Sequence, residues 1–180
     1  HLKQGHDCLN IRGLCYISKT APEKGIELPC FETIQSDKIA FSEMFKTFYR
    51  NNDPLTAQIL FQKQDTRYLV QNPPQPSLTQ KKLDEIHSFD YMREAHPYYL
   101  KDGPVKALET IRFSVLVHRG CYGECSFCSI AVHQGRTVRS RSKTSILNEV
   151  KAITTHPLFK GSIVDIGGPT ANMYGFECTK

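Results

Sequence analysis

The 180-residue sequence has no apolar run near the roughly 20 residues that a membrane-spanning helix needs. It also lacks the basic and then apolar start of a secretory signal peptide. These absences argue against a membrane partner and make a cytoplasmic location the expectation. The first residue is not methionine, and the last residue closely follows a glycine-rich loop, so we expect a piece of a longer protein.

The sequence has seven cysteines, an odd number, so they cannot all be paired in disulfide bonds within the chain. In a reducing compartment we expect the four scattered cysteines to be ordinary packed thiols. The remaining three lie within eight residues in the spacing C-x3-C-x2-C and need a specific explanation. The scattered residues are Cys8, Cys15, Cys30 and Cys178, and the crowded ones are Cys121, Cys125 and Cys128.

The net charge of +5 is small, but it is concentrated. Between Arg112 and Lys151 there are seven basic residues and two acidic ones, an excess of five. A local basic surface can attract an anionic partner. A solvent-exposed basic face near the start of a helix explains the same charges equally well.

The first part of the chain predicts a small domain that ends in a proline-rich linker. Apolar residues at helical spacing predict a helix over 37–49, whose stripe we expect to be core. Two β-like runs, 58–62 and 67–71, predict a hairpin. The rest is expected to be mostly loop over 1–35 with a strand near 14–17, a stiff linker over 72–76 and a short helix over 79–87. The stripe comprises Ala40, Phe41, Met44, Phe45 and Phe48.

A domain boundary is predicted near Pro104, which separates residues 1–104 from residues 105–180. A buried strand over 111–117 runs into the cysteine loop, and Ser142 caps a helix that ends near His156. A second strand over 162–166 follows. This strand–helix–strand pattern predicts parallel strands, at whose carboxyl ends ligands collect.

Three thiolates on one short loop can bond three separate irons of a metal cluster. Gly120 and Gly123 let the backbone bend around such a cluster. The alternatives are a zinc site completed by His118, His133 or Cys178, a ferredoxin-like carrier, and a redox pair of Cys125 and Cys128. A ferredoxin needs a fourth cysteine and usually has C-x2-C-x2-C spacing, and the redox pair leaves Cys121 unexplained.

Three cysteines at this spacing, directly after a strand of a parallel sheet, resemble the signature of the radical S-adenosylmethionine (SAM) superfamily. The resemblance implies a [4Fe-4S] cluster on Cys121, Cys125 and Cys128, with SAM on the free iron and reductive cleavage to a 5′-deoxyadenosyl radical. It implies that Phe127 lies against the adenine and that the backbone of Gly167 and Gly168 contacts the SAM amino group. Where the superfamily pattern continues with glutamate, this chain has Pro169-Thr170.

Further stretches resemble proteins of the YgiQ family. They are Cys125–Ile130, His133–Arg136, Ser140–Ser142 and Gly167–Tyr174, with Asn72-Pro-Pro74 and His96-Pro97 upstream. The implied fold is α/β: residues 105–180 begin an incomplete (β/α)6 radical SAM barrel, and residues 1–104 end an N-terminal α/β domain.

We therefore expect part of a radical SAM enzyme with an unassigned substrate and a one-electron donor such as flavodoxin or ferredoxin. At least one of Arg136, Arg139 and Arg141 is expected to pair with the SAM carboxylate, and Arg136 is the candidate. His133 has no assigned role, and the other histidines are expected to be surface or structural residues. The alternatives are methylthiotransferase-like modification of RNA or protein, and a non-catalytic iron–sulfur or zinc module that binds nucleic acid through residues 136–143.

Overall fold

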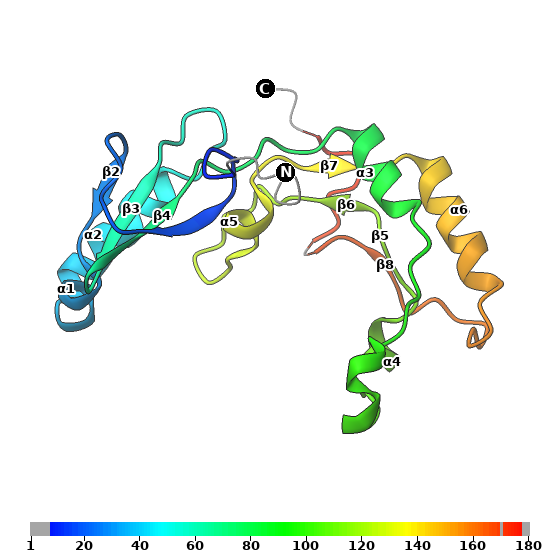
Figure 1. Ribbon diagram of the computed structural model, residues 1–180. Coiled ribbons are helices and arrows are strands. Elements are labelled where there is room, and N and C mark those ends of the chain that lie inside the picture. The colour runs from blue at the N-terminus through cyan, green and yellow to red at the C-terminus, as the bar shows by residue number, and fades with distance from the viewer. Residues whose placement is uncertain (1–7, 170, 178–180) are drawn as a thin grey trace. The chain divides into compact units, whose positions relative to one another are not determined.

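The computed structural model describes residues 8–169 and 171–177, and it divides into two compact units (Figure 1). The first unit reaches Ser77 and the second begins at Leu78. Both units mix helices with strands, as an α/β chain should. No helix in the described residues is long and apolar enough to cross a membrane.

A four-stranded sheet in the order β1-β4-β3-β2 forms the first unit. The predicted hairpin is confirmed as β3 and β4, which are antiparallel and pair Phe61 with Val70, both buried. β1 is antiparallel to β4, and β2 is parallel to β3. The strands are β1 Cys15–Ser18, β2 Ile26–Leu28, β3 Leu60–Gln64 and β4 Arg67–Gln71.

Two helices, α1 (Phe31–Ser36) and α2 (Lys38–Arg50), complete the first unit. α2 confirms the predicted helix, and the Asp37 carboxylate caps it by accepting from the backbone N–H groups of Ile39 (2.7 Å) and Ala40 (3.2 Å). The prediction that its apolar stripe is core is wrong, because Phe41 is 50% exposed and Phe45 is 51% exposed. The reason is that α1, which packs against α2, makes the main helix contact with β3.

The proline-rich segment after β4 has no regular structure, as predicted, but it is anchored. Asn72 is buried, and its side-chain amide donates to the backbone oxygens of Leu9 (2.6 Å) and Ile11 (2.9 Å). The Arg12 guanidinium donates to the Pro74 carbonyl at 3.1 Å. These bonds attach Asn72-Pro-Pro74 to residues 9–12, so this stretch has a structural role within the first unit.

In the second unit, two short sheets share a branch point at Val117. β5 (Ser114–Leu116) is parallel to β8 (Asp165–Gly167), and β6 (His118–Arg119) is antiparallel to β7 (Arg139–Ser140). The Val117 N–H donates to Gly167 (2.8 Å), and its carbonyl accepts from the N–H of Arg141 (2.9 Å). One strand predicted over 111–117 is therefore divided, with Ile111 in a helix and the chain changing partners at Val117.

Helix α6 (Lys143–Thr154) joins the two sheets and covers the core. Its Ser142 cap is confirmed, since the Ser142 hydroxyl accepts from the Ser145 N–H at 3.1 Å. Phe113, Val115 and Ile153 form the buried centre. The predicted β–α–β unit is confirmed, although its second strand begins at Asp165. The remaining helices are α3 Gln80–His87, η2 Pro97–Asp102, α4 Leu108–Ile111 and α5 Ile130–Gln134.

Residues 78–104 pack with the second unit. α3 buries Leu83, the Asp84 carboxylate accepts from the Ser142 N–H at 3.0 Å, and Arg93 pairs with Glu149 at 2.5 Å. The contacts thus divide the chain 27 residues before the boundary predicted near Pro104 (104 − 77). Where a radical SAM core begins in this chain stays a prediction.

Candidate functional site

The cysteine loop begins where β6 ends and is closed by the start of α5. Gly120 opens it with a φ of +89°, and a Cβ at this position would lie 2.1 Å from the Thr137 carbonyl oxygen. The Cys121 N–H donates to the Gly135 carbonyl at 3.1 Å. Glycine is therefore required at position 120 on two grounds, its backbone conformation and the close approach of residue 137.

The three cysteines of the loop differ in exposure. Cys121 is buried, Cys128 is intermediate and Cys125 is exposed. A Cβ at Gly123 would lie 3.4 Å from the Cys121 sulfur and 3.7 Å from the Cys125 sulfur, so both sulfurs lie beside this residue. The Cys128 N–H donates to the Cys125 carbonyl at 2.9 Å, which folds the third cysteine back in a turn.

The loop matches an iron–sulfur cluster in its donor chemistry. Thiolates are the ligands that such clusters use, and N–H groups directed at sulfur tune them. The Gly123 N–H lies 3.4 Å from the Cys121 sulfur, in hydrogen-bonding geometry. Within residues 8–169 and 171–177, no three His, Cys, Asp or Glu side chains are gathered as a ready ligand set. Assignment of the three cysteines to a cluster stays a prediction.

The glycine loop lies beside the cysteine loop, as the parallel strands predict. β8 pairs Gly167 with Leu116, so the carboxyl ends of β5 and β8 meet. A Cβ at Gly168 would lie 1.8 Å from Nε2 of His118. Thr170 falls outside the described residues, as does Cys178.

The sequence names His118 only as a possible zinc ligand or as a surface or structural residue, and it does not predict the contacts that the structure gives this side chain. It is fully buried, and its Nε2 accepts from the Met173 N–H at 3.1 Å. Burial lowers the pKa of His118 below 6.5, while the backbone of Ala171 acts in the opposite direction. The histidine follows the apolar run Val115-Leu-Val117, which is a signal for a buried side chain, but no sequence pattern names its partners.

The other predicted site residues lie on the surface or in ion pairs. Phe127 is 91% exposed, and His133 in α5 is exposed. Arg136 pairs with Glu124 across the base of the cysteine loop. Arg139 pairs with Glu177 at 3.3 Å.

Arg141 is a structural residue. Its side chain is completely buried, pairs with Glu149 and donates to the Leu116 carbonyl at 2.7 Å and to the Ser145 hydroxyl at 2.9 Å. Its carbonyl accepts from the Tyr174 hydroxyl at 3.1 Å. Arg141 therefore joins β5, α6 and the segment after the glycine loop, and its inclusion among the SAM-carboxylate candidates is wrong.

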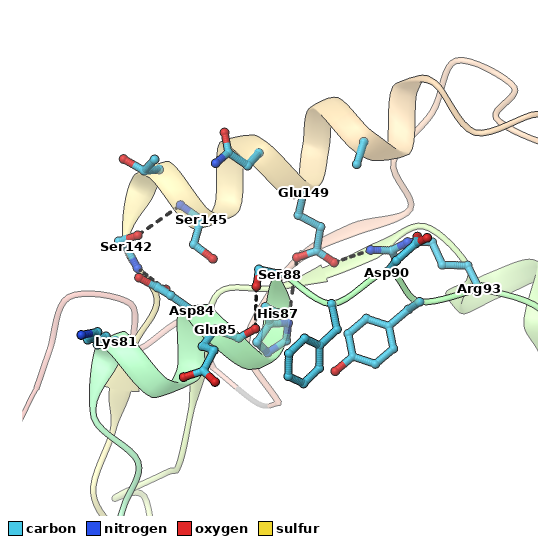
Figure 2. Close-up of a pocket in the computed structure, with 15 residues that line it drawn as sticks. Lys81, Asp84, Glu85, His87, Ser88, Asp90, Arg93, Ser142, Ser145 and Glu149 are labelled. Atoms are coloured by element: carbon cyan, nitrogen blue, oxygen red, sulfur yellow. Dashed lines mark hydrogen bonds and ion pairs between the residues drawn. The ribbon is translucent and has the colours of Figure 1, made fainter.

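Glu149 is the centre of the charges beneath α6 (Figure 2). It pairs with Arg141 and Arg93, and His87 Nδ1 lies 4.0 Å from its carboxylate. Burial lowers the pKa of His87, and the Arg141 charge lowers it further. A cavity of about 840 Å³ opens here between α3 and α6, and neither the cysteines nor the glycine pair line it.

Comparison with known proteins gives one family and a group of relatives. A family model described as radical SAM N-terminal matches residues 1–114. A UPF0313 protein of Fusobacterium nucleatum is 55% identical over 179 residues, which cover 99% of this chain and 32% of that protein. UPF0313 proteins of Thermotoga maritima and Methanocella arvoryzae are each 47% identical, over 96% and 99% of this chain and 30% of theirs. This chain thus spans about a third of the length of these relatives, and no solved structure matches it.

Proposed function

Since this chain belongs to the radical SAM superfamily as a UPF0313 (YgiQ-like) sequence, we propose that it carries the cluster and SAM loops of a radical SAM enzyme. One observation carries the proposal: β5 and β8 are parallel, the glycine loop follows β8, and β5 leads through Val117 and β6 into the cysteine loop, so both loops leave from the same end of the pair. Ligands of open parallel sheets collect at that end. The substrate is unassigned.

Cys121, Cys125 and Cys128 would hold a [4Fe-4S] cluster. The sulfurs of Cys121 and Cys125 both lie beside Gly123, and the Met173 side chain reaches the same place. A cluster held there would, once reduced, supply the one electron for reductive cleavage of SAM. The chain's own part is to hold the ligands in line and to exclude water.

The SAM contacts are proposed for four residues. The backbone of Gly167 and Gly168 would meet the amino group, and the exposed ring of Phe127 is free to lie against the adenine. Arg136 would exchange Glu124 for the SAM carboxylate when SAM binds. Such an exchange is inexpensive, because an exposed ion pair contributes about 0–1 kcal/mol.

The proposed wider fold is an incomplete (β/α)6 barrel, of which β5 and β8 are the first two strands. Their parallel pairing through α6 supports this reading. The reaction would need a one-electron donor such as flavodoxin or ferredoxin, and the cytoplasmic location remains an expectation. A module that binds nucleic acid through residues 136–143 stays the alternative, and Arg141 is unavailable to it because its side chain is completely buried against Glu149.

Metal content tests the proposal. A full-length UPF0313 protein carrying this sequence, reconstituted without oxygen, should contain about four irons and four sulfides. Alanine at Cys121, Cys125 or Cys128 should abolish this content, whereas alanine at Cys8, Cys15, Cys30 or Cys178 should leave it intact. Tightly bound zinc without sulfide would contradict the proposal.

A further inference from the structure

His118 connects the two loops of the proposed site through a buried side chain. β6 places it three residues before Cys121, and its Nε2 accepts the backbone N–H of Met173, five residues beyond Gly168. The ring is 0% exposed. The bond is partly buried, and a backbone N–H shielded from water costs free energy when it loses its acceptor, so this bond holds the segment after the glycine pair in place.

The second contact of His118 is with Gly168 itself. A Cβ on Gly168 would lie 1.8 Å from Nε2 and 2.1 Å from Cε1 of the ring, far inside any allowed approach. The ring therefore occupies the space that any other residue at position 168 would fill. Gly168 lacks a side chain because His118 packs against it, in addition to any approach by a ligand.

We propose that His118 is a positioning residue, which sets the glycine loop against the cysteine loop so that the Gly168 backbone faces bound SAM. The inference rests on the proposed function, since it assigns a task within that site. It acts on SAM through Gly168 and Met173 and requires no direct contact with a ligand. A merely structural histidine would affect stability and cluster content together, whereas a positioning residue affects SAM binding first.

The test compares two histidines that each accept one backbone N–H. His118→Phe keeps a ring but removes the acceptor for Met173. His156→Phe is the matched control, because His156 Nδ1 accepts from the Leu158 N–H at 3.1 Å and its ring packs on Phe113, before β5 rather than after it. Both variants are made in the full-length, reconstituted protein, and SAM binding is measured by equilibrium titration.

We expect His118→Phe to retain iron and sulfide and to raise the SAM dissociation constant about tenfold, the effect of losing one partly buried hydrogen bond. We expect His156→Phe to stay within about twofold of the parent protein. An unchanged SAM dissociation constant in His118→Phe, with the cluster intact, would overturn the inference.

A second pair of variants, in which residue 168 is enlarged and residue 118 is made smaller, tests the inference if His118→Phe does not fold. Gly168→Ala should lose SAM binding, because its methyl group meets the ring. Adding His118→Ala opens that space, so the double variant should bind SAM more tightly than Gly168→Ala alone. If the second change only adds to the loss, the two residues are not coupled and the inference fails.

Hydrogen exchange separates this inference from the proposed function. In protein without cluster or SAM, the Met173 amide should exchange about fivefold faster or more in His118→Phe than in the parent or in His156→Phe. Equal exchange rates of the Met173 amide in the parent and in both variants would show that His118 does not hold this segment, whatever the protein binds. A parent protein that takes up a cluster but binds no SAM would overturn the proposed function. The role of His118 in placing SAM would then fall as well.

Discussion

Arg141 and Arg136 show how burial decides the role of an arginine. Arg141 is completely buried against Glu149, whereas 28% of the Arg136 side chain and 44% of the Glu124 side chain are exposed. Breaking a buried pair leaves an uncompensated charge and costs about 3–5 kcal/mol, while an exposed pair contributes about 0–1 kcal/mol.

We therefore predict that Arg141→Ala lowers the free energy of unfolding by about 3 kcal/mol. Arg136→Ala should lower it by less than about 1 kcal/mol and should weaken SAM binding instead. Urea unfolding of the two variants measures the first effect, and SAM titration measures the second. Similar stability losses in both variants would contradict the account.

Buried His118 and partly buried His87 predict sensitivity to acid. Burial lowers the pKa of His118 and of His87 below 6.5, so the unfolded chain takes up protons at a higher pH than the folded chain does. Their contribution to stability is complete above pH 6.5 and is lost as the pH falls below it, toward their folded pKa values.

Melting temperatures at pH 7.5 and about 5.5 test this sign in the parent and in His118→Phe. The variant should start from a lower melting temperature but lose less of it on acidification, because one of the two titrating groups is gone. A steeper acid loss in His118→Phe would contradict the assignment.

At the scale of the element, the cysteine loop depends on the close contact at its entry. Gly120 and Gly161 have nearly the same φ, +89° and +88°, but a Cβ at Gly120 would meet the Thr137 backbone while nothing lies within 4 Å of one at Gly161. Strain from a positive φ alone costs about 1–3 kcal/mol.

Alanine at the two positions separates the steric effect from the conformational one. Gly161→Ala should lower stability by about 1 kcal/mol and leave cluster content unchanged. Gly120→Ala should lower both, because the loop entry and residue 137 must move apart. Iron and sulfide analysis gives the answer, and equal iron content in the two variants would contradict the role assigned to Gly120.

The elements that local patterns define were predictable, and those that depend on distant partners were not. α2, α6 and the β3–β4 hairpin follow from caps, helical spacing and β-like runs. The division of the strand at Val117 arises from bonds to Gly167 and Arg141, and no local signal announces such partners. The apolar face of α2 looks like core in the sequence, yet Phe45 remains half exposed.

The same limit applies to the candidate site. The cysteine spacing and the glycine pair could be read from the sequence, because their signals are local. The burial of Arg141 and the packing of His118 on Gly168 involve residues 25–55 positions apart in the sequence, so the prediction that the whole basic stretch binds ligands was too broad.

At the scale of the whole molecule, the described residues contain a parallel pair, β5 and β8, with apolar surface beside it. Val164 is 53% exposed and Ile166 is 55% exposed. Two strands alone are marginally stable, and an uncovered edge invites pairing between chains. We predict that these 180 residues, expressed alone, aggregate, whereas a protein of the relatives' length does not.

Light scattering coupled to size exclusion measures this difference. Ile166→Lys should reduce aggregation of the short chain, because a charge at a sheet edge opposes pairing. A monomeric short chain that unfolds cooperatively would show that the second unit needs no further strands.

The central claim is the chemistry at the cysteine loop, and product analysis tests it most directly. With dithionite and SAM under anaerobic conditions, a full-length UPF0313 protein carrying this sequence should form 5′-deoxyadenosine and methionine in equal amounts. Cys128→Ala should form neither, while Cys15→Ala, altered in the first unit, should match the parent. S-adenosylhomocysteine as the sole product, or undiminished cleavage by Cys128→Ala, would contradict the account.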